Sequence, residues 1–434
     1  MQPPPRSDRP ASAPEALAIV SVHASPLGRL GSGENGGMNL AIRRLCEELA
    51  ARGIPSDVFV RRDHPQTPAE QLIAPGSRLV HLDAGPLRPL AKDEVLSHLP
   101  AFTSRLLAHA ESEGRSYRLL HSHYWLSGWV ASRAASRWRI PWVHSSHTLA
   151  RLKAQAGLPL DPARAEMEQI IVRGADRLVA VSSAEERALS ELYGASSDRV
   201  CVVPPGVDVE LFEPRPLTPL RARYGVQGRR VILTAGRLER LKGVDLLIEA
   251  LALLRREPGF DDIALLCAGE DSGDGRSQAG HPEGERGRLE ALARSLHVET
   301  AVSFLGAVDP EELAGLYLLA DVVAVPSMTE TFGLVALEAQ AAGTPVVACA
   351  VGGLADTVSD GVTGVLVEGR DPADFAAALR GVLADGRLRR RMGDAARENA
   401  ARRTWVRSAD RLQSLYDCVE SPEADGVLEA CGCL

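Results

Sequence analysis

Short apolar runs alternate with amphipathic helical patterns along almost the whole chain of 434 residues. Each run is only a few residues long and rich in valine, leucine and isoleucine, which is typical of strands buried on both faces of a parallel sheet. The expected strands are residues 17–22, 56–60, 78–82, 118–122, 141–145, 177–181 and 199–203 in the first half, and 230–234, 263–268, 302–305, 322–325 and 345–348 in the second. Because helical patterns separate these runs, we predict an α/β fold with doubly wound sheets.

Proline and glycine interrupt both periodicities between residues 203 and 216, which indicates a domain boundary. The expected segments are a disordered tail at 1–15, an N-terminal Rossmann-like domain at 16–208, a C-terminal Rossmann-like domain at 209–404, a helix at 405–420 and a disordered tail at 421–434. The first tail lacks the apolar stretch of a signal peptide. The two domains would face each other across a cleft.

Composition excludes several classes of protein. The formal charge is −8 and the basic residues are scattered, so nucleic acid is not an expected partner. No apolar run approaches the roughly 20 residues that a membrane span needs. Four of the seven cysteines stand singly within apolar or amphipathic segments, which favours buried thiols in a reducing, cytoplasmic environment. Cys431 and Cys433 could bind a metal or oxidise, but we interpret them as a chance pair in a tail.

Two carboxylates, Glu330 and Glu338, flank a Phe-Gly-Leu step with seven residues between them. The segment follows the apolar run 322–326 and opens a helical stretch at 335–342. A strand that turns into a helix presents free N–H groups, which favour phosphate. A carboxylate beside a phosphate site usually binds hydroxyl groups, as in dinucleotide folds. With Glu330 in the loop and Glu338 about two turns into the helix, the motif predicts recognition of a nucleotide sugar.

Two cations, Arg237 and Lys242, lie between the strand 230–234 and a helix expected at 244–254. From a loop at the carboxyl end of a strand they would project into the cleft. There they could neutralise a diphosphate leaving group, arginine by its fork and lysine as a point charge. Elsewhere the same spacing would be ordinary solvated charge.

The first half contains a glycine-rich loop at 28–39, before a helix expected from Asn39. This loop could contact a phosphate, or it could be a flexible connection between strand and helix. A P-loop is excluded, because the chain has no Gly-x-x-x-x-Gly-Lys-Ser/Thr motif. His147 follows an apolar strand and is either a structural histidine or a site residue. With His144 it could be read as a metal pair, but no carboxylate or cysteine completes the set. The chain also contains no Asp-x-Asp, so we predict no metal site.

In combination, Gly236-Arg237…Lys242-Gly243 and the segment 326–338 resemble the retaining glycosyltransferases of family 4, with the GT-B fold. The resemblance extends over about 18–416. It implies a nucleotide-diphosphate sugar donor in the C-terminal domain, an acceptor in the N-terminal domain and a terminal helix that crosses back to the first domain. It implies no required metal or other cofactor, since the nucleotide sugar is a co-substrate.

Segments 22–26, 31–39, 121–128 and 146–150 resemble the branch of this family that moves N-acetylglucosamine from UDP to an inositol phosphate in mycothiol biosynthesis. The acceptor would be a phosphorylated cyclitol such as 1L-myo-inositol-1-phosphate. The resemblance implies that acceptor contacts fall on Asn39, Lys92, Tyr124, Thr148 and Arg164. Two cations with two hydroxyls suit a phosphomonoester dianion. Without the resemblance, Arg164 would pass as a surface charge on a helix.

The resemblance also assigns the donor side. The Gly37 amide, Arg237 and Lys242 would bind the diphosphate, and His147 and Glu330 would bind sugar hydroxyls. Glu338 would bind the ribose, and the backbone near Val308 would bind uracil. The amides of Phe332, Gly333 and Leu334 would position the sugar and the phosphate. The catalytic set is His147, Arg237, Lys242 and Glu330. The implied mechanism retains configuration without an enzymic nucleophile: the acceptor hydroxyl attacks from the leaving-group face and a phosphate oxygen takes its proton.

Some residues depart from the pattern of this branch and leave the identity of the donor sugar undecided. Met328 and Thr329 stand where an aromatic residue and an asparagine are expected, and the polar stretch 269–287 predicts an unusually long loop. The rival enzymes are a sucrose-phosphate-synthase-like glucosyltransferase and an aminocyclitol-antibiotic glycosyltransferase. A nucleotide-sugar-binding regulator without turnover is the rival from another class. A dinucleotide dehydrogenase is disfavoured, because this chain has no Gly-x-Gly-x-x-Gly after its first strand. The oligomeric state, including a homodimer, is left open.

Overall fold

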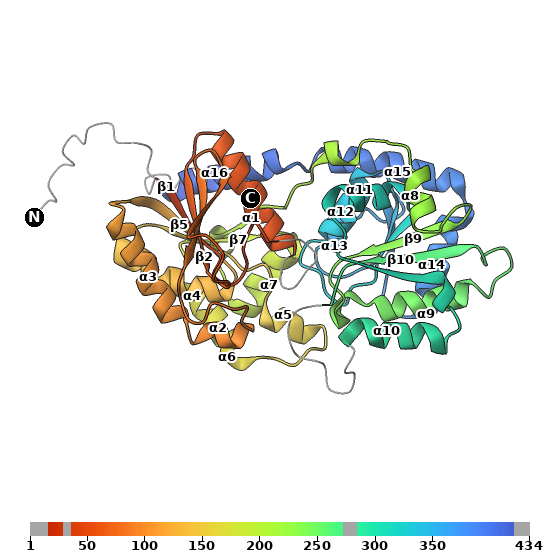
Figure 1. Cartoon of the computed structure of the whole chain (residues 1–434), viewed down its shortest axis with the longest axis horizontal. Coiled ribbons are helices and arrows are strands. Elements are labelled where there is room, and N and C mark those ends of the chain that lie inside the picture. Colours follow the sequence, from red (N-terminus) through yellow and green to blue (C-terminus); the bar gives the residue numbers. More distant parts are fainter. Residues whose placement is uncertain (1–15, 29–35, 272–283, 421–434) are drawn as a thin grey trace, which may run out of the picture.

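The computed structural model describes residues 16–28, 36–271 and 284–420. Its described part holds two sheets in separate domains, side by side along the long axis of the molecule (Figure 1). The strand orders are β3-β4-β2-β1-β5-β6-β7-β8 and β11-β10-β9-β12-β13-β14. In both sheets the chain begins in the middle, winds to one edge and then reverses, which creates a crevice at the switch point. The predicted doubly wound α/β class is therefore confirmed.

The first sheet is parallel apart from one edge strand. Its strands are β1 (Ala16–Val20), β2 (Ser56–Arg61), β3 (Glu70–Ala74), β4 (Ser77–Leu82), β5 (Tyr117–His123), β6 (Trp142–Ser145), β7 (Arg177–Ala180) and β8 (Val200–Val202). The antiparallel strand β3 was not predicted. It lies at the edge, and its first three residues are exposed, so it has no apolar run to signal it.

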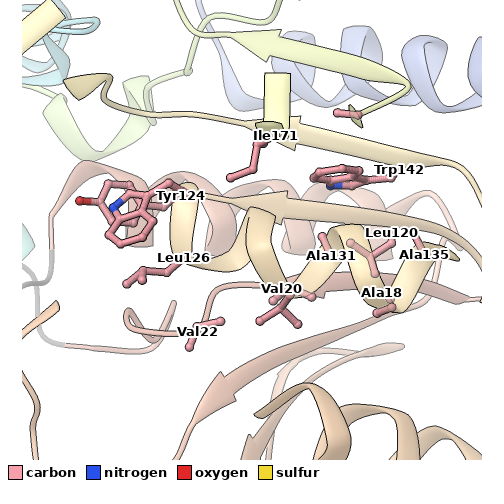
Figure 2. Close-up of a cluster of buried hydrophobic side chains, with 14 of the residues drawn as sticks. Ala18, Val20, Val22, Leu120, Tyr124, Leu126, Ala131, Ala135, Trp142 and Ile171 are labelled. Atoms are coloured by element: carbon pink, nitrogen blue, oxygen red, sulfur yellow. The ribbon is translucent and has the colours of Figure 1, made fainter. Parts of the chain in front are cut away.

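Helices cover both faces of this sheet. They are α1 (Gly37–Ala51), α2 (Lys92–Leu96), α3 (Leu99–Ser112), α4 (Trp125–Trp138), α5 (Ala150–Gln155), α6 (Pro162–Gly174) and α7 (Ser183–Tyr193), with a 3-10 turn at Ser197–Arg199. Figure 2 shows Ala131 and Ala135 of α4 beside Leu120, where small side chains let the helix approach the sheet. The helical pattern of residues 92–113 suggests one continuous helix, but the segment forms two helices, α2 and α3, because Pro100 opens a new helix after a break.

The second sheet is parallel throughout. Its strands are β9 (Arg230–Ala235), β10 (Ile263–Ala268), β11 (Val302–Gly306), β12 (Val322–Val325), β13 (Val346–Cys349) and β14 (Gly364–Val367). The helices are α8 (Thr218–Arg223), α9 (Val244–Leu254), α10 (Gly284–Ser295), α11 (Pro310–Leu319), α12 (Leu334–Ala341), α13 (Leu354–Thr357), α14 (Pro372–Ala384) and α15 (Gly386–Ala401), with 3-10 turns at Val209–Phe212, Arg240–Lys242 and Glu299–Ala301. The end of the loop predicted at 269–287 is helical, since α10 begins at Gly284. Residues 272–283 of that prediction lie outside the described part.

The last helix, α16 (Trp405–Glu420), packs against the first domain (Figure 1). Leu412, Leu415 and Tyr416 share a buried cluster with residues of β1 and β5. The Tyr416 hydroxyl lies 2.7 Å from Nδ1 of His121. Two stretches of chain therefore connect the domains, one after β8 and one before α16. The tails predicted at 1–15 and 421–434, including Cys431 and Cys433, lie outside the described residues.

Three of the cysteines, Cys46, Cys267 and Cys349, are fully buried and free, as predicted for small apolar side chains. Burial raises the pKa of the Cys46 thiol and of the Cys267 thiol to about 12, so both stay protonated. None of the described helices combines the length and the apolar character needed to cross a membrane.

Candidate active site

A cleft of about 440 Å³ lies between the two domains, at the carboxyl ends of the strands of both sheets. Ligands of open α/β sheets bind at this edge. The residues predicted from the sequence that line the cleft are Gly37, Asn39, Lys92, Tyr124, His147 and Thr148 from the first domain, and Arg237, Lys242, Val308, Glu330, Phe332, Gly333, Leu334 and Glu338 from the second. Arg164 is the predicted site residue that does not line it.

The loop after β9 carries the two predicted cations of the second domain. Lys242 ends a 3-10 turn, and its Nζ lies 2.7 Å from Oε2 of Glu330. Burial alone would lower the pKa of Lys242, but Glu330 and Glu239 outweigh it and raise the pKa above its ordinary value. The ammonium is therefore charged at neutral pH. Arg237 lies beside Glu239, with Nη2 to Oε1 at 3.4 Å.

The loop between β12 and α12 brings backbone amides to the cleft. Gly333 caps α12 with a φ of 95°, a conformation that favours glycine. Gly352, at a φ of 51°, packs so closely that a Cβ there would lie 2.0 Å from the Glu330 carbonyl oxygen. These contacts fix the path of the loop, so that Phe332, Gly333 and Leu334 lie at the positive end of the helix. This arrangement would suit an anion.

Glu338 lies about one turn into α12, not two as predicted, because the helix begins at Leu334. Its Oε2 accepts a 2.7 Å hydrogen bond from the hydroxyl of Tyr317 on α11. Burial raises the pKa of Glu338 to about 7. The side chain lines the cleft and can accept hydrogen bonds from ligand hydroxyls once it is ionised.

His147 follows β6 in the left-handed region, at a φ of 60°. Its Nε2 lies 2.8 Å from Nδ1 of His123, and burial lowers its pKa to about 4, so the ring is neutral. Its backbone carbonyl accepts a hydrogen bond from the Thr331 hydroxyl at 2.8 Å. His144 is buried in the core instead, with Nδ1 2.9 Å from the Ser122 hydroxyl. Among the residues that the structure describes, neither His144 nor His147 belongs to a group of three side chains that could bind a metal.

Across the cleft, Lys92 begins α2, Tyr124 follows β5 and Thr148 follows β6. The Lys92 Nζ lies 5.9 Å from the centre of the Tyr124 ring. Tyr124 has a φ of 74°, a strained value for a residue with a side chain. Such strain is common at ligand sites. These residues form the wall of the first domain that faces the donor-side loops.

Arg164 lies behind this wall rather than in it. Its Nη2 donates to Oγ1 of Thr148 at 3.0 Å, and its Nε donates to Oε1 of Glu168 at 2.7 Å. The guanidinium lies 5.0 Å from the Tyr124 ring centre. The Arg164 side chain is only 11% exposed. Arg164 is therefore not a surface charge, and its contacts place it in support of Thr148, while its predicted contact with the acceptor stays a prediction.

Asn39 also has a structural part. Its Oδ1 accepts from the Gly36 amide at 3.1 Å, and its Nδ2 donates to the Ser25 carbonyl at 2.7 Å. These bonds cap α1 and tie it to the loop after β1. The start of α1 is at Gly37, two residues before the predicted position, and a Cβ on Gly37 would lie 2.7 Å from Cδ1 of Leu334. The two domains thus approach closely at the glycine-rich loop.

The cleft has further lining residues that the sequence did not single out: His23, Lys153, Glu239 and Tyr317. His23 is half-buried, and desolvation together with Lys92 lowers its pKa to about 3. The sequence signal for His23 was its place directly after the first strand. Lys153 and Tyr317 lie within helical patterns and have no comparable signal.

Two doubly wound domains, a cleft at both switch points, cationic loops on one side and a hydroxyl-rich wall on the other define a glycosyltransferase of the GT-B architecture. Comparison with known proteins agrees. The family model for glycosyl transferases group 1 matches residues 219–399, and that for the glycosyl transferase 4-like domain matches residues 36–206.

Among curated relatives, the D-inositol 3-phosphate glycosyltransferase of Corynebacterium jeikeium is 43% identical over 92% of this chain and 96% of its own. The enzyme of the same name from Geodermatophilus obscurus is 45% identical over 94% and 90%. The solved sucrose-phosphate synthase of Thermosynechococcus elongatus superposes with a TM-score of 0.84 at 34% identity, over 93% of this chain and 98% of its own. The chain therefore belongs to the group 1 family of glycosyltransferases.

Proposed function

We propose that the protein transfers N-acetylglucosamine from UDP-N-acetylglucosamine to a phosphorylated cyclitol such as 1L-myo-inositol-1-phosphate, with retention of configuration. The names of the relatives at 43% and 45% identity support the acceptor. The observation that carries the proposal is the placement of Lys92, Tyr124 and Thr148 across the cleft from Arg237 and Lys242. One cationic region suits the donor diphosphate, and the opposite wall suits a second phosphate on the acceptor.

The donor would lie on the second domain. Arg237, Lys242 and the amides at the start of α12 bind the diphosphate and stabilise the charge that develops on it as the glycosidic bond breaks. Glu338 takes the ribose hydroxyls, and the backbone at Val308 takes the base. Glu330 and His147 orient the sugar.

The acceptor hydroxyl would approach from the first domain. Glu330 is held by Lys242 at 2.7 Å, which suits a role in binding hydroxyls better than attack on the anomeric carbon. The acceptor hydroxyl therefore attacks on the face from which UDP departs, and its proton passes to a phosphate oxygen. The protein orients the two partners and excludes water. The positive charge at the leaving phosphate comes from side chains, so we expect turnover without an added metal.

A second candidate is glucosyl transfer to fructose-6-phosphate. The likeness to sucrose-phosphate synthase, at a TM-score of 0.84, favours it. Both candidates use a phosphorylated acceptor, and the wall of Lys92, Tyr124 and Thr148 suits either. Met328 and Thr329, which depart from the mycothiol branch, lie on the donor side, where the two donors differ.

A matrix of donors and acceptors tests the proposal. The donors are UDP-N-acetylglucosamine and UDP-glucose, and the acceptors are 1L-myo-inositol-1-phosphate, free inositol and fructose-6-phosphate, each with and without EDTA. We expect UDP release only for the first donor with the first acceptor, unaffected by EDTA, and an α-linked product by proton NMR. Equal rates with free inositol remove the acceptor assignment, and preference for fructose-6-phosphate selects the second candidate. Donor binding without turnover over the whole panel indicates a regulator.

A further inference from the structure

Histidine side chains gather where two neighbouring strands of the first sheet end. Strand β5 ends with His121-Ser122-His123, and β6 is followed two residues later by His147. Alternate residues of a strand face the same side, so His121 and His123 share one face of the sheet. The proposed function uses His147 and leaves His121 and His123 without a role.

The rings of His121, His123 and His147 form a stack that leads from the core to the cleft. The ring centres of His121 and His123 are 4.2 Å apart, and those of His123 and His147 are 5.1 Å apart. Both nitrogens of the buried His121 are held, one by the Tyr416 hydroxyl at 2.7 Å and the other by the Ser145 hydroxyl at 2.8 Å. The inner end of the stack is therefore fixed, and its outer ring, His147, lines the cleft.

A hydrogen bond joins Nδ1 of His123 to Nε2 of His147 at 2.8 Å. Burial, with smaller contributions from His121 and His147, lowers the pKa of His123 well below its ordinary value, and burial lowers the pKa of His147 to about 4. Both rings are therefore neutral at neutral pH, and each carries a single N–H. Of the two facing nitrogens one donates and the other accepts, so His123 determines whether Nδ1 of His147 is a donor or an acceptor.

The main chain of His147 is held from the other side of the cleft. Its carbonyl accepts a hydrogen bond from the Thr331 hydroxyl at 2.8 Å, and its φ of 60° is a strained value for a residue with a side chain. The second domain thus fixes the backbone of His147, whereas His123 of the first domain fixes its ring. Because His123 occupies Nε2, Nδ1 is the ring nitrogen left for a ligand.

We propose that His123 is a positioning residue, which holds the ring of His147 in one orientation and one tautomer so that Nδ1 meets a hydroxyl group of the donor sugar. The inference rests on the proposed function for the contact between His147 and the sugar. Without His123 the ring can turn about its side-chain bonds and exchange its proton between the two nitrogens. Fewer molecules then present the correct group, and turnover falls because the sugar is less well oriented.

Two replacements of equal shape separate the hydrogen bond from the volume of the side chain. Leucine and asparagine branch at the same atom, so His123→Asn keeps a polar group near the position of Nδ1 and His123→Leu does not. We expect kcat to fall about tenfold or more for His123→Leu and to stay within about threefold of the wild type for His123→Asn. UDP lacks the transferred sugar, so its dissociation constant, measured by calorimetry, should be unchanged in both. Equal kcat values for the two variants overturn the inference.

The matched control is His144→Leu. It removes a buried, neutral imidazole from the adjacent strand β6, together with its 2.9 Å bond to the Ser122 hydroxyl, and leaves the stack intact. We expect it to lower the midpoint of urea unfolding as His123→Leu does, with kcat close to that of the wild type. A fall in kcat as large as that of His123→Leu assigns the loss to general loosening of the sheet and overturns the inference.

Nuclear magnetic resonance of the full chain, labelled with ¹⁵N-histidine, reports the tautomer itself. The His147 signals are identified by their loss in His147→Gln. We expect a single neutral tautomer of His147 in the wild type and an average of both tautomers in His123→Leu. Averaged tautomers in the wild type overturn the inference and leave the proposed function intact. A wild type that shows no turnover in the matrix of donors and acceptors overturns the proposed function instead.

Discussion

The hydroxyl of Thr331 donates a hydrogen bond to the backbone carbonyl of His147 at 2.8 Å, and so joins the two domains at residues that line the cleft. The Thr331 carbonyl accepts a second bond from the Ser182 hydroxyl at 2.6 Å. One residue beside Glu330 thus touches the first domain twice. The arrangement couples the donor loop to the residue that would orient the sugar.

Replacing Thr331 tests this coupling. Thr331→Val removes the hydroxyl at almost constant volume and leaves the His147 carbonyl without its partner, so kcat/KM should fall about fivefold to tenfold. Thr331→Ser keeps the hydroxyl and should stay within twofold of the wild type. Steady-state kinetics with both substrates measure the effect. If the valine and serine variants behave alike, the bond has no part in turnover.

Lys242→Ala should lower kcat by about 10² or more, because it removes a preorganised positive charge from the leaving phosphate. The change also leaves Glu330 without its partner at 2.7 Å. Arg240→Ala removes an exposed charge from the same 3-10 turn and serves as the control. Single-turnover rates separate the chemical step from binding. A rate equal to that of the control contradicts the assigned role.

The raised pKa of Glu338 predicts a dependence of stability on pH. In the unfolded chain this carboxyl ionises near its ordinary value of 4.5, whereas in the folded protein it keeps its proton to about pH 7. The folded state therefore binds more protons than the unfolded state between these values, and the unliganded protein loses stability as pH rises from 4.5 to 7. Glu338→Gln stays neutral, so its stability relative to the wild type should increase over this range, by on the order of 2–3 kcal/mol. Urea unfolding at pH 5 and pH 7.5 measures the difference.

Two glycines in the left-handed region separate backbone strain from steric contact. Gly352 has a φ of 51° and would place a Cβ 2.0 Å from the Glu330 carbonyl oxygen, whereas Gly361 has a φ of 70° and open space around it. Gly361→Ala should cost only the conformational term of about 1–2 kcal/mol. Gly352→Ala should cost more and should also raise the donor KM, since the loop that carries Glu330 must move. Equal costs in urea unfolding would mean that the loop adapts freely.

Much of the fold was predictable because strands buried on both faces leave uninterrupted apolar runs. Strands β3 and β14 were not predicted, because β3 is a polar edge strand and β14 is a short run after a turn. The cations Arg237 and Lys242 were found because parallel topology brings all strand ends to one edge.

The buried contacts behind the site could not be predicted from the sequence. Arg164 and Glu168 are four residues apart on a helix, a spacing that also fits an exposed ion pair. Only the packing of α5, α6 and α7 shows that the pair is buried. The bond between Tyr317 and Glu338 joins two helices, and neither residue signals it in the sequence.

The terminal helix α16 has a consequence for biosynthesis. Its Leu412 and Tyr416 complete an apolar cluster with Leu17 and Leu119, which the ribosome makes hundreds of residues earlier. The newly made first domain must therefore keep part of its apolar surface in contact with water, or with a chaperone, until α16 has been made. The first domain can therefore close its core only after α16 has been made, and not at completion of residue 208.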